Sequence, residues 1–186
     1  MVADSDPGAS GSAPDLQTAW QNAVWLDSDG FAGDTYYNDS LFYVDTTGLH
    51  FFKSFSDMTR DADAEDFVTF NGELYFRAND GVDGYELWKF DGTTVSQVAD
   101  IHAGSDGSYP SDFTVYDGKL YFEADDGVDG DELWVFDGTT ASQVADINAG
   151  SGNSYPYDLT VYDGALYFQA DDGVDGGELW VFDGTT

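Results

Sequence analysis

The chain has 186 residues, of which 41% are hydrophobic and 17% aromatic, a composition that supplies a core and argues against disorder over most of its length. Five Lys and Arg stand against 37 Asp and Glu, and the formal net charge of -32 argues against nucleic acid and anionic membranes as partners. No apolar run of about 18 residues could insert into a bilayer, and the absence of cysteine excludes disulfides and thiol chemistry.

In chain order, the predicted elements form copies of one unit. The last three copies begin at Asp66, Asp112 and Asp158, and therefore recur every 46 residues. Self-similarity at a period of about 20 to 50 residues marks an array whose units cannot bury their apolar surface alone. We expect a single repeat domain over residues 1–186, with units at about 15–58, about 66–101, about 112–147 and about 158–186.

The first copy has diverged from the others. Residues 40–58 align with residues 132–150, and apolar positions match apolar positions. Upstream, residues 23–34 parallel residues 120–131, which leaves Thr35 to Asp39 as an insertion. By contrast, the third and fourth copies agree at 25 of 29 residues between 112–140 and 158–186, which implies a recent duplication.

Each unit is predicted to be a meander of four strands. In the third copy the strands are DFTVY, KLYFEA, ELWVF and SQVADI, and Asp-Gly pairs between them favour tight hairpins. The segments LYF and LWVF are apolar on both faces, so both faces of each sheet must be covered. Sheets stacked face to face around an axis meet this requirement. The predicted fold is therefore all-β, a β-propeller of four four-stranded antiparallel blades.

The N-terminus is predicted to complete the last unit. The fourth copy stops at Thr186, where its fourth strand should begin, and Val2-Ala3-Asp4 matches residues 144–146 of that missing strand. We expect residues 2–4 to supply the outer strand of the final blade and to close the ring. Two alternatives stay open: the strand pairs with a neighbouring molecule to give a homo-oligomer, or the chain is a piece of a longer array.

Three segments carry a family resemblance. They read ELWKFDGTT from Glu86 and ELWVFDGTT from Glu132 and Glu178, each preceded by DGVDG. They resemble the ELWxxDGT repeat of bacterial surface or secreted proteins, over residues 66–186 well and over 15–65 weakly. The resemblance implies no activity, because that family has no unifying biochemical function. This sequence departs from the pattern where a His often sits, with Asp83, Asp129 and Asp175 in its place.

The loop between the second and third strands is the best candidate for metal chemistry. It reads ANDGVDGYE, ADDGVDGDE and ADDGVDGGE in the last three copies, and its acids and bent backbone could supply the oxygens that calcium requires. Two other interpretations are polar turn geometry and adaptation to high salt, since Asp supplies 31 of the 37 acids. The candidate ligands are Asp80, Asp83, Glu86, Asp126, Asp129, Glu132, Asp172, Asp175 and Glu178, with Asp27, Asp29 and Asp34 forming a weaker site in the first copy.

The recurring aromatic residues divide into two groups. Trp88, Trp134 and Trp180 are surrounded by Leu and Phe, so we expect them to pack between blades rather than to stack on sugars. Tyr109 and Tyr155 lie outside the strands, in the SYP connections, and are candidate ligand contacts.

Catalysis is not expected. The two histidines, His50 and His102, occupy non-equivalent positions in the copies, and no serine lies in a nucleophile elbow. The sequence favours a non-catalytic, calcium-stabilised binding or adhesion module, extracellular or at a bacterial surface, with a glycan or a surface protein as partner. The alternatives are a structural subunit that assembles by exchange of the terminal strand, and a carbohydrate-binding lectin.

Overall fold

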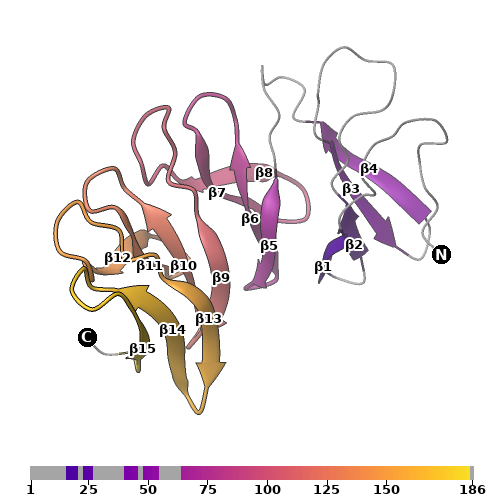
Figure 1. Ribbon diagram of the computed structural model, residues 1–186. Coiled ribbons are helices and arrows are strands. Elements are labelled where there is room, and N and C mark those ends of the chain that lie inside the picture. Colours follow the sequence, from indigo (N-terminus) through magenta and orange to yellow (C-terminus); the bar gives the residue numbers. More distant parts are fainter. Residues whose placement is uncertain (1–15, 21–22, 27–39, 46–47, 55–63, 185–186) are drawn as a thin grey trace, which may run out of the picture.

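The computed structural model describes residues 16–20, 23–26, 40–45, 48–54 and 64–184, with side chains over 64–184. Every element in these ranges is a strand, and the strands form four antiparallel sheets in which sequence neighbours pair (Figure 1). The first sheet comprises β1 (Leu16–Trp20), β2 (Ala23–Leu26), β3 (Ser40–Asp45) and β4 (Gly48–Ser54). The second comprises β5 (Glu65–Phe70), β6 (Glu73–Asn79), β7 (Tyr85–Phe90) and β8 (Val95–Ala99).

The third sheet also has four strands, and the last sheet has three. The third comprises β9 (Ser111–Tyr116), β10 (Lys119–Asp125), β11 (Asp131–Phe136) and β12 (Ala141–Ala145). The last comprises only β13 (Tyr157–Tyr162), β14 (Ala165–Asp171) and β15 (Gly177–Phe182). The predicted meander is confirmed in the second and third sheets. The predicted outer strand at residues 2–4 lies outside the described residues.

The hairpins between the first two strands of a unit follow from their turn residues. Asn71-Gly72 has φ angles of 51° and 81°, and Asp117-Gly118 has 46° and 72°. Two successive positive φ angles are the requirement of a type I′ turn, whose twist matches that of the flanking strands. Asp163-Gly164 repeats this geometry, so an Asn-Gly or Asp-Gly dipeptide sets the same strand register in the last three units.

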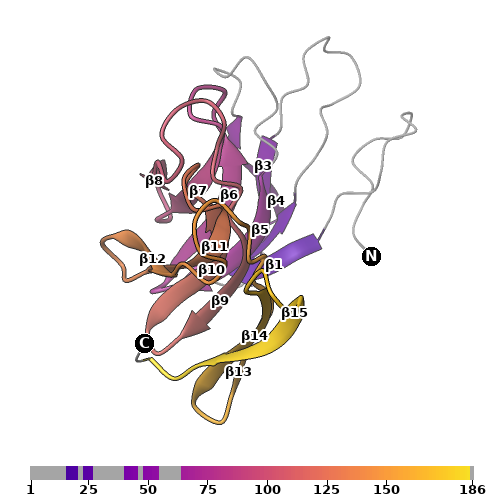
Figure 2. The same ribbon diagram turned by 60° about the vertical axis from the view of Figure 1, so that its left-hand side comes forward.

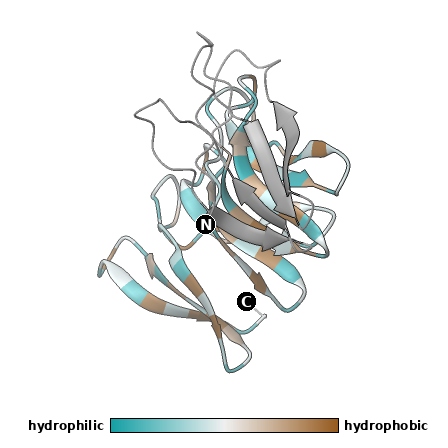
Figure 3. Cartoon of the chain, turned by 90° about the vertical axis from the view of Figure 1, so that its right-hand side faces the viewer, coloured by the Kyte–Doolittle hydropathy of each residue, from teal (hydrophilic) through white to brown (hydrophobic). Residues whose placement is uncertain are grey.

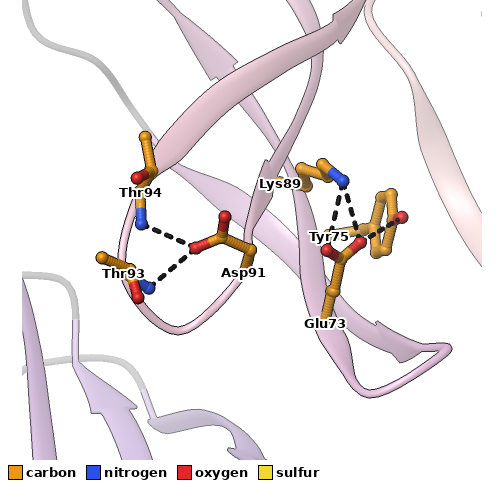
Figure 4. A network of polar contacts seen from close by, with 6 residues as sticks. All are labelled: Glu73, Tyr75, Lys89, Asp91, Thr93 and Thr94. Atoms are coloured by element: carbon orange, nitrogen blue, oxygen red, sulfur yellow. Dashed lines mark hydrogen bonds and ion pairs between the residues drawn. The ribbon is translucent and has the colours of Figure 1, made fainter.

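A second turn joins the third and fourth strands. The Oδ1 atom of Asp91 accepts hydrogen bonds from the backbone N–H groups of Thr93 and Thr94, at 2.8 and 2.7 Å (Figure 4). These bonds lower the pKa of Asp91, because they favour the charged carboxylate. Asp137 forms the same turn with the same consequence. The DGT segments of the sequence are therefore turn formers.

Apolar side chains pack between consecutive sheets as well as within them. We call the face of a sheet that meets the preceding sheet its trailing face, and the face that meets the next sheet its leading face. Tyr75 and Leu87 on the leading face of the second sheet join Leu120, Phe122 and Trp134 on the trailing face of the third in one buried cluster. Figure 3 shows apolar residues interspersed with hydrophilic ones along these strands.

The same packing recurs one step further along the chain. The leading face of the third sheet contributes Tyr116, Tyr121 and Leu133 to a cluster with Leu166 and Phe168 of the last sheet. Hydrogen bonds join the same two sheets, since the Tyr116 hydroxyl donates to the Gly164 carbonyl at 2.8 Å. Trp134 is buried in the cluster between the second and third sheets, and the partly buried Trp180 packs against the cluster between the third and last, as predicted for both. Trp88 is buried in a cluster on the trailing face of the second sheet, which confirms that it is a core residue.

The sheets form an open row. Contacts between first strands join β1 to β5, β5 to β9 and β9 to β13. The first and last sheets lie at opposite ends of this row in Figure 1, and Figure 2 shows the same succession from another side. The described strands do not form a closed ring, so the predicted closure is absent from this part of the chain.

The first sheet corrects one detail of the predicted alignment. Its β3 and β4 pair with the register and the bulge that β11 and β12 show, which confirms the alignment of residues 40–58. In β2, however, Val24 pairs with Val44, as Leu120 pairs with Phe136. Val24, rather than Ala23, is therefore the counterpart of Leu120, and the predicted alignment was wrong by one residue. A strand without a distinctive motif leaves such a shift undetected in sequence.

Candidate functional site

The loops between second and third strands and the connections between sheets gather at one end of the sheets. In the second unit these are residues 80–84 and 100–110. Ser108 and Tyr109 donate backbone hydrogen bonds to the carbonyl of Tyr85, at 2.9 and 3.0 Å, so the connection lies directly against the end of β7. We call this set of loops and connections the loop belt.

Glu86 holds the connection from inside the core. Its side chain is fully buried. Its carboxylate accepts hydrogen bonds from the backbone N–H groups of Ile101 (3.0 Å), His102 (3.3 Å) and Ser108 (3.0 Å), and from the Ser108 hydroxyl (2.6 Å). Burial raises the pKa of Glu86, and these bonds oppose that rise. One carboxylate thus holds both ends of the stretch from Ile101 to Ser108, which makes up most of the connection between β8 and β9.

The same clasp recurs in the third unit. Glu132 is fully buried and accepts hydrogen bonds from the N–H groups of Ile147 (2.9 Å) and Asn148 (3.2 Å) and from the Ser154 hydroxyl (2.7 Å). The carbonyl of Ser154 then accepts a bond from the N–H of Asp171 in the next sheet, at 2.9 Å. Each serine therefore links two consecutive sheets as well as closing the clasp.

Close backbone contacts make the loop belt compact. A Cβ atom on Gly84 would lie 2.6 Å from the backbone nitrogen of Gly107, and one on Gly130 would lie 2.7 Å from the carbonyl oxygen of Gly152. Only glycine fits at such an approach. In the second and third units, the last glycine of the DGVDG motif is thus explained by the docking of the connection onto its loop.

Neighbouring units are also in contact along the belt. The ring of His102 lies against Gly127 of the next loop, and the side chain of Asn148 lies against Gly173 in the same way. His102 and Asn148 are equivalent positions, which accounts for one of the two histidines as a packing residue. The backbone of His50 lies in β4, and its side chain is outside the described set.

The aspartates of the loops act as turn acceptors. Asp80 Oδ1 accepts hydrogen bonds from the N–H groups of Val82 and Asp83, at 2.8 and 2.9 Å. Asp126 forms the same two bonds with Val128 and Asp129, and Asp172 bonds Val174 at 2.9 Å. Such bonds close the loop without any ion.

The predicted metal ligands are not gathered around one point in the described loops. Within residues 64–184 no group of three or more acidic or histidine side chains is arranged to hold a metal ion. Glu86 and Glu132 point into the core, to the clasps, while the aspartates close the turns outside. Asp27, Asp29 and Asp34 fall outside the described residues. Calcium binding stays a prediction.

Two exposed tyrosines project from the loop belt. Tyr109 and Tyr155 each expose 53% of their surface and have φ angles of 49° and 47°. A positive φ is uncommon for a bulky residue and persists only where its surroundings impose it. Here the clasp serine precedes each tyrosine. Their predicted position outside the strands is confirmed, and their role in binding stays a prediction.

Tyr109 belongs to a small aromatic and charged surface. Its ring stacks on that of Tyr85 with centroids 5.2 Å apart, and the Arg77 guanidinium lies 5.8 Å from the centre of the Tyr85 ring. Arg77 also forms ion pairs with Glu65 and Asp66. At the other tyrosine, the Asn153 amide donates to the Tyr155 hydroxyl at 2.6 Å. Both rings are therefore held in place.

Two acids lie close to the start of β9: the partly buried Glu123 of β10, which pairs with Ser111, and the exposed Asp112. Burial raises the pKa of Glu123 to about 7, although the Ser111 hydroxyl donates to its carboxylate at 2.7 Å. Desolvation also raises the pKa of Asp112, and the charges of Asp158 and Asp66 raise it further. Sequence reasoning missed these residues, because a single Glu within a strand gives no sign that neighbouring acids will surround it.

Comparisons with known proteins bear on the fold. No protein-family model matches this chain, and no curated protein matches it. Among solved structures, the chain is similar to the β-propeller domain of the Trilobed protease from Pyrococcus furiosus, which is described as having an open velcro topology. The TM-score is 0.61 at 14% identity, over 95% of this chain and 53% of that one. The chain thus has a propeller-like arrangement of sheets and spans about half the length of the structure it matches.

Proposed function

We propose that this chain is a non-catalytic binding module of the propeller type, acting outside the cell or at a bacterial surface, with the loop belt as its binding face. The observation that carries the proposal is the rigid, repeated presentation of exposed side chains. In each of two successive units, a buried glutamate fixes the connection from which Tyr109 or Tyr155 projects. Contact residues that are already ordered lose little entropy on binding.

Repetition supports a binding role over a single active site. Val82 and Val128, each 66% exposed, lie at the tips of equivalent loops of the loop belt. Identical contacts presented side by side suit a ligand that itself repeats, because the second contact forms at a high effective concentration. The charge of -32 favours a neutral or cationic partner. A glycan or a surface protein meets this description.

The proposal keeps two sequence-based expectations. The strand at residues 2–4 would complete the last sheet, in which β15 has no partner on its outer side among the described strands. The Asp-Gly loops would take up calcium through the carboxylate oxygens that the turns leave free. The described part of the chain contains no helix that is long and apolar enough to cross a bilayer.

A glycan array tests the proposal. The labelled chain should bind neutral or amino-sugar glycans, and the Tyr109→Ala, Tyr155→Ala double variant should lose that binding, since it removes both aromatic contacts. Val115→Ala is the matched control: Val115 is 40% exposed but lies beside the hairpin at the opposite end of its sheet. An array without hits would contradict the glycan form of the proposal. Equal loss in the control would show that the tyrosines are not the contacts.

A further inference from the structure

The leading face of the last sheet is an exposed apolar surface. It carries Tyr162, Leu179 and Val181, which expose 69%, 78% and 59% of their surface. Tyr162 and Tyr167 pack together near the hairpin end of this face, with ring centroids 6.1 Å apart. A contiguous group of large apolar side chains at the surface marks an interaction site more often than chance exposure does.

The two preceding sheets show what covers this face. Leu133 and Tyr116 hold the positions of Leu179 and Tyr162 one unit earlier, and they expose only 1% and 7% of their surface. What buries them is the trailing face of the next sheet, in the cluster that contains Leu166 and Phe168. The face of the last sheet therefore repeats an interface that the chain already forms twice.

The complementary surface lies at the other end of the row. In the first sheet, strand register places Val24 and Val44 at the positions of Leu120 and Phe136. These are trailing-face positions in the third sheet, where both residues belong to the buried cluster. The first and last sheets of one chain stand apart in the row (Figure 1), so the first sheet that can reach the exposed face belongs to another copy.

The size of the propeller that the chain resembles gives the number of copies. The row of sheets matches 53% of that chain at a TM-score of 0.61, so two such rows amount to about one complete propeller. Two copies joined head to tail would bury two identical interfaces and leave no sheet face exposed. A head-to-tail contact that closes in this way gives a discrete assembly instead of a filament.

We propose that two copies of this chain close into one propeller ring, in which the leading face of β13–β15 of each copy covers the trailing face of the first sheet of the other. This pairing does not depend on what the loop belt binds. Each copy carries a charge of -32, so we expect pairing to tighten as salt screens the repulsion.

Light scattering coupled to size-exclusion chromatography tests the ring, in molar NaCl over a range of protein concentrations. The wild-type chain should have twice its mass of 20.2 kDa. Leu179→Glu should give the single-chain mass, because a carboxylate in the interface is costly to bury. Val174→Glu is the matched control: Val174 is 79% exposed at a loop tip away from the face, and this variant should stay paired.

Circular dichroism and thermal unfolding of the same samples separate folding from assembly. Leu179 is exposed in the single chain, so Leu179→Glu should keep the β spectrum. A wild-type chain that stays single at all concentrations would overturn the proposal. If the wild-type chain stayed single and the Leu179→Glu variant melted at a lower temperature than the wild type, the face would be covered by the chain's own first sheet. Open-ended polymers, or a Leu179→Glu variant that still pairs, would overturn it equally.

Discussion

The third and last sheets have nearly the same sequence and different surroundings. Residues 112–140 and 158–186 agree at 25 of 29 positions. Yet Leu133 is 1% exposed and Leu179 is 78% exposed, and Glu132 is fully buried in a clasp while Glu178 Oε2 has no hydrogen-bond partner in the described structure. The same residues in the same register thus have different energetic roles, because the described structure places a following sheet and connection against the third sheet and none against the last.

The comparison teaches where the stability of a repeat array resides. Hairpin turns and strand register are alike in the two sheets, so they are properties of the unit. Burial of the leading face and closure of the clasp are properties of the interface between units. Stability in such arrays is approximately a sum of these two contributions. Paired substitutions at equivalent positions can therefore measure the interface contribution alone.

The largest difference is expected between Leu133→Ala and Leu179→Ala. Removing a buried leucine side chain costs about 2–5 kcal/mol, so Leu133→Ala should lower the free energy of unfolding by an amount in that range. Leu179→Ala should leave it nearly unchanged in dilute protein, where chains do not pair. Urea unfolding followed by fluorescence measures both. Equal losses would show that Leu179 is covered within a single chain, and the comparison would fail.

The next difference concerns the clasp. Glu132→Gln replaces the carboxylate that accepts bonds from Ile147, Asn148 and Ser154 with an amide of the same shape. Hydrogen bonds to charged groups contribute about 1.5–3 kcal/mol, so the loss should fall near this range and should loosen the connection. Glu178→Gln should have little effect, because Glu178 Oε2 has no hydrogen-bond partner in the described structure. Urea unfolding gives the energies, and hydrogen exchange at Ile147 reports the loosening; unchanged exchange would count against the clasp.

A pH-dependent difference of smaller size is expected at Glu123, which is replaced by Gln169 in the last sheet. The pKa of Glu123 rises from 4.5 in the unfolded chain to about 7 in the folded protein. Between these pH values the folded state binds more protons than the unfolded state, so stability falls as pH rises. Above pH 7 the cost of the buried charge is fully present.

Glu123→Gln removes that cost and makes the third sheet match the last at this position. The variant should melt at a higher temperature than the wild type at pH 8, and the two should converge below pH 4.5. Melting curves over this pH range are the measurement. Gln169→Glu is the reciprocal variant and should introduce a similar dependence. A constant difference at every pH would mean that packing, and not ionisation, separates the proteins.

Local features of this fold were predictable from sequence, and contacts between units were less so. The strands, the Asp-Gly turns and the burial of Trp88 and Trp134 follow from short patterns, and the structure confirms them. The open row was not predicted. The angle between successive sheets depends on side chains packed across the interface, and the ring size changes with small differences in that angle.

The candidate site shows the same division. The loop positions of Tyr109 and Tyr155 were predictable, because both follow the strands in connections of distinct composition. The role of Glu86 and Glu132 was not, since a glutamate beside an acidic loop is equally typical of a metal ligand. One sequence sign could have revealed it: a serine follows each of these glutamates by 22 residues, and the two serine hydroxyls donate to them.

The smallest expected effect is the response of the melting temperature to calcium. The third and last sheets should contribute alike to it, because both keep the Asp-Gly loop. A ligand that binds only the folded state adds about 2.7 kcal/mol at a hundred times its dissociation constant, and in a protein of this size each kcal/mol raises the melting temperature by about 2–4 °C. Any salt will also raise the melting temperature, because it screens the net charge of -32. The melting temperature in calcium must therefore be compared with that in NaCl of equal ionic strength and with that in EDTA.

Asp126→Asn and Asp172→Asn separate ligation from turn geometry. Asparagine keeps the side-chain oxygen that accepts the turn hydrogen bonds of Asp126 and Asp172, and it removes the charge that a cation needs. If the loops bind calcium, both variants should keep the wild-type melting temperature in EDTA and lose part of its rise in calcium, to a similar extent. Equal rises in calcium and in matched NaCl, with or without these aspartates, would identify the loops as solvated turns, and the acidity of the chain would then act only through its net charge.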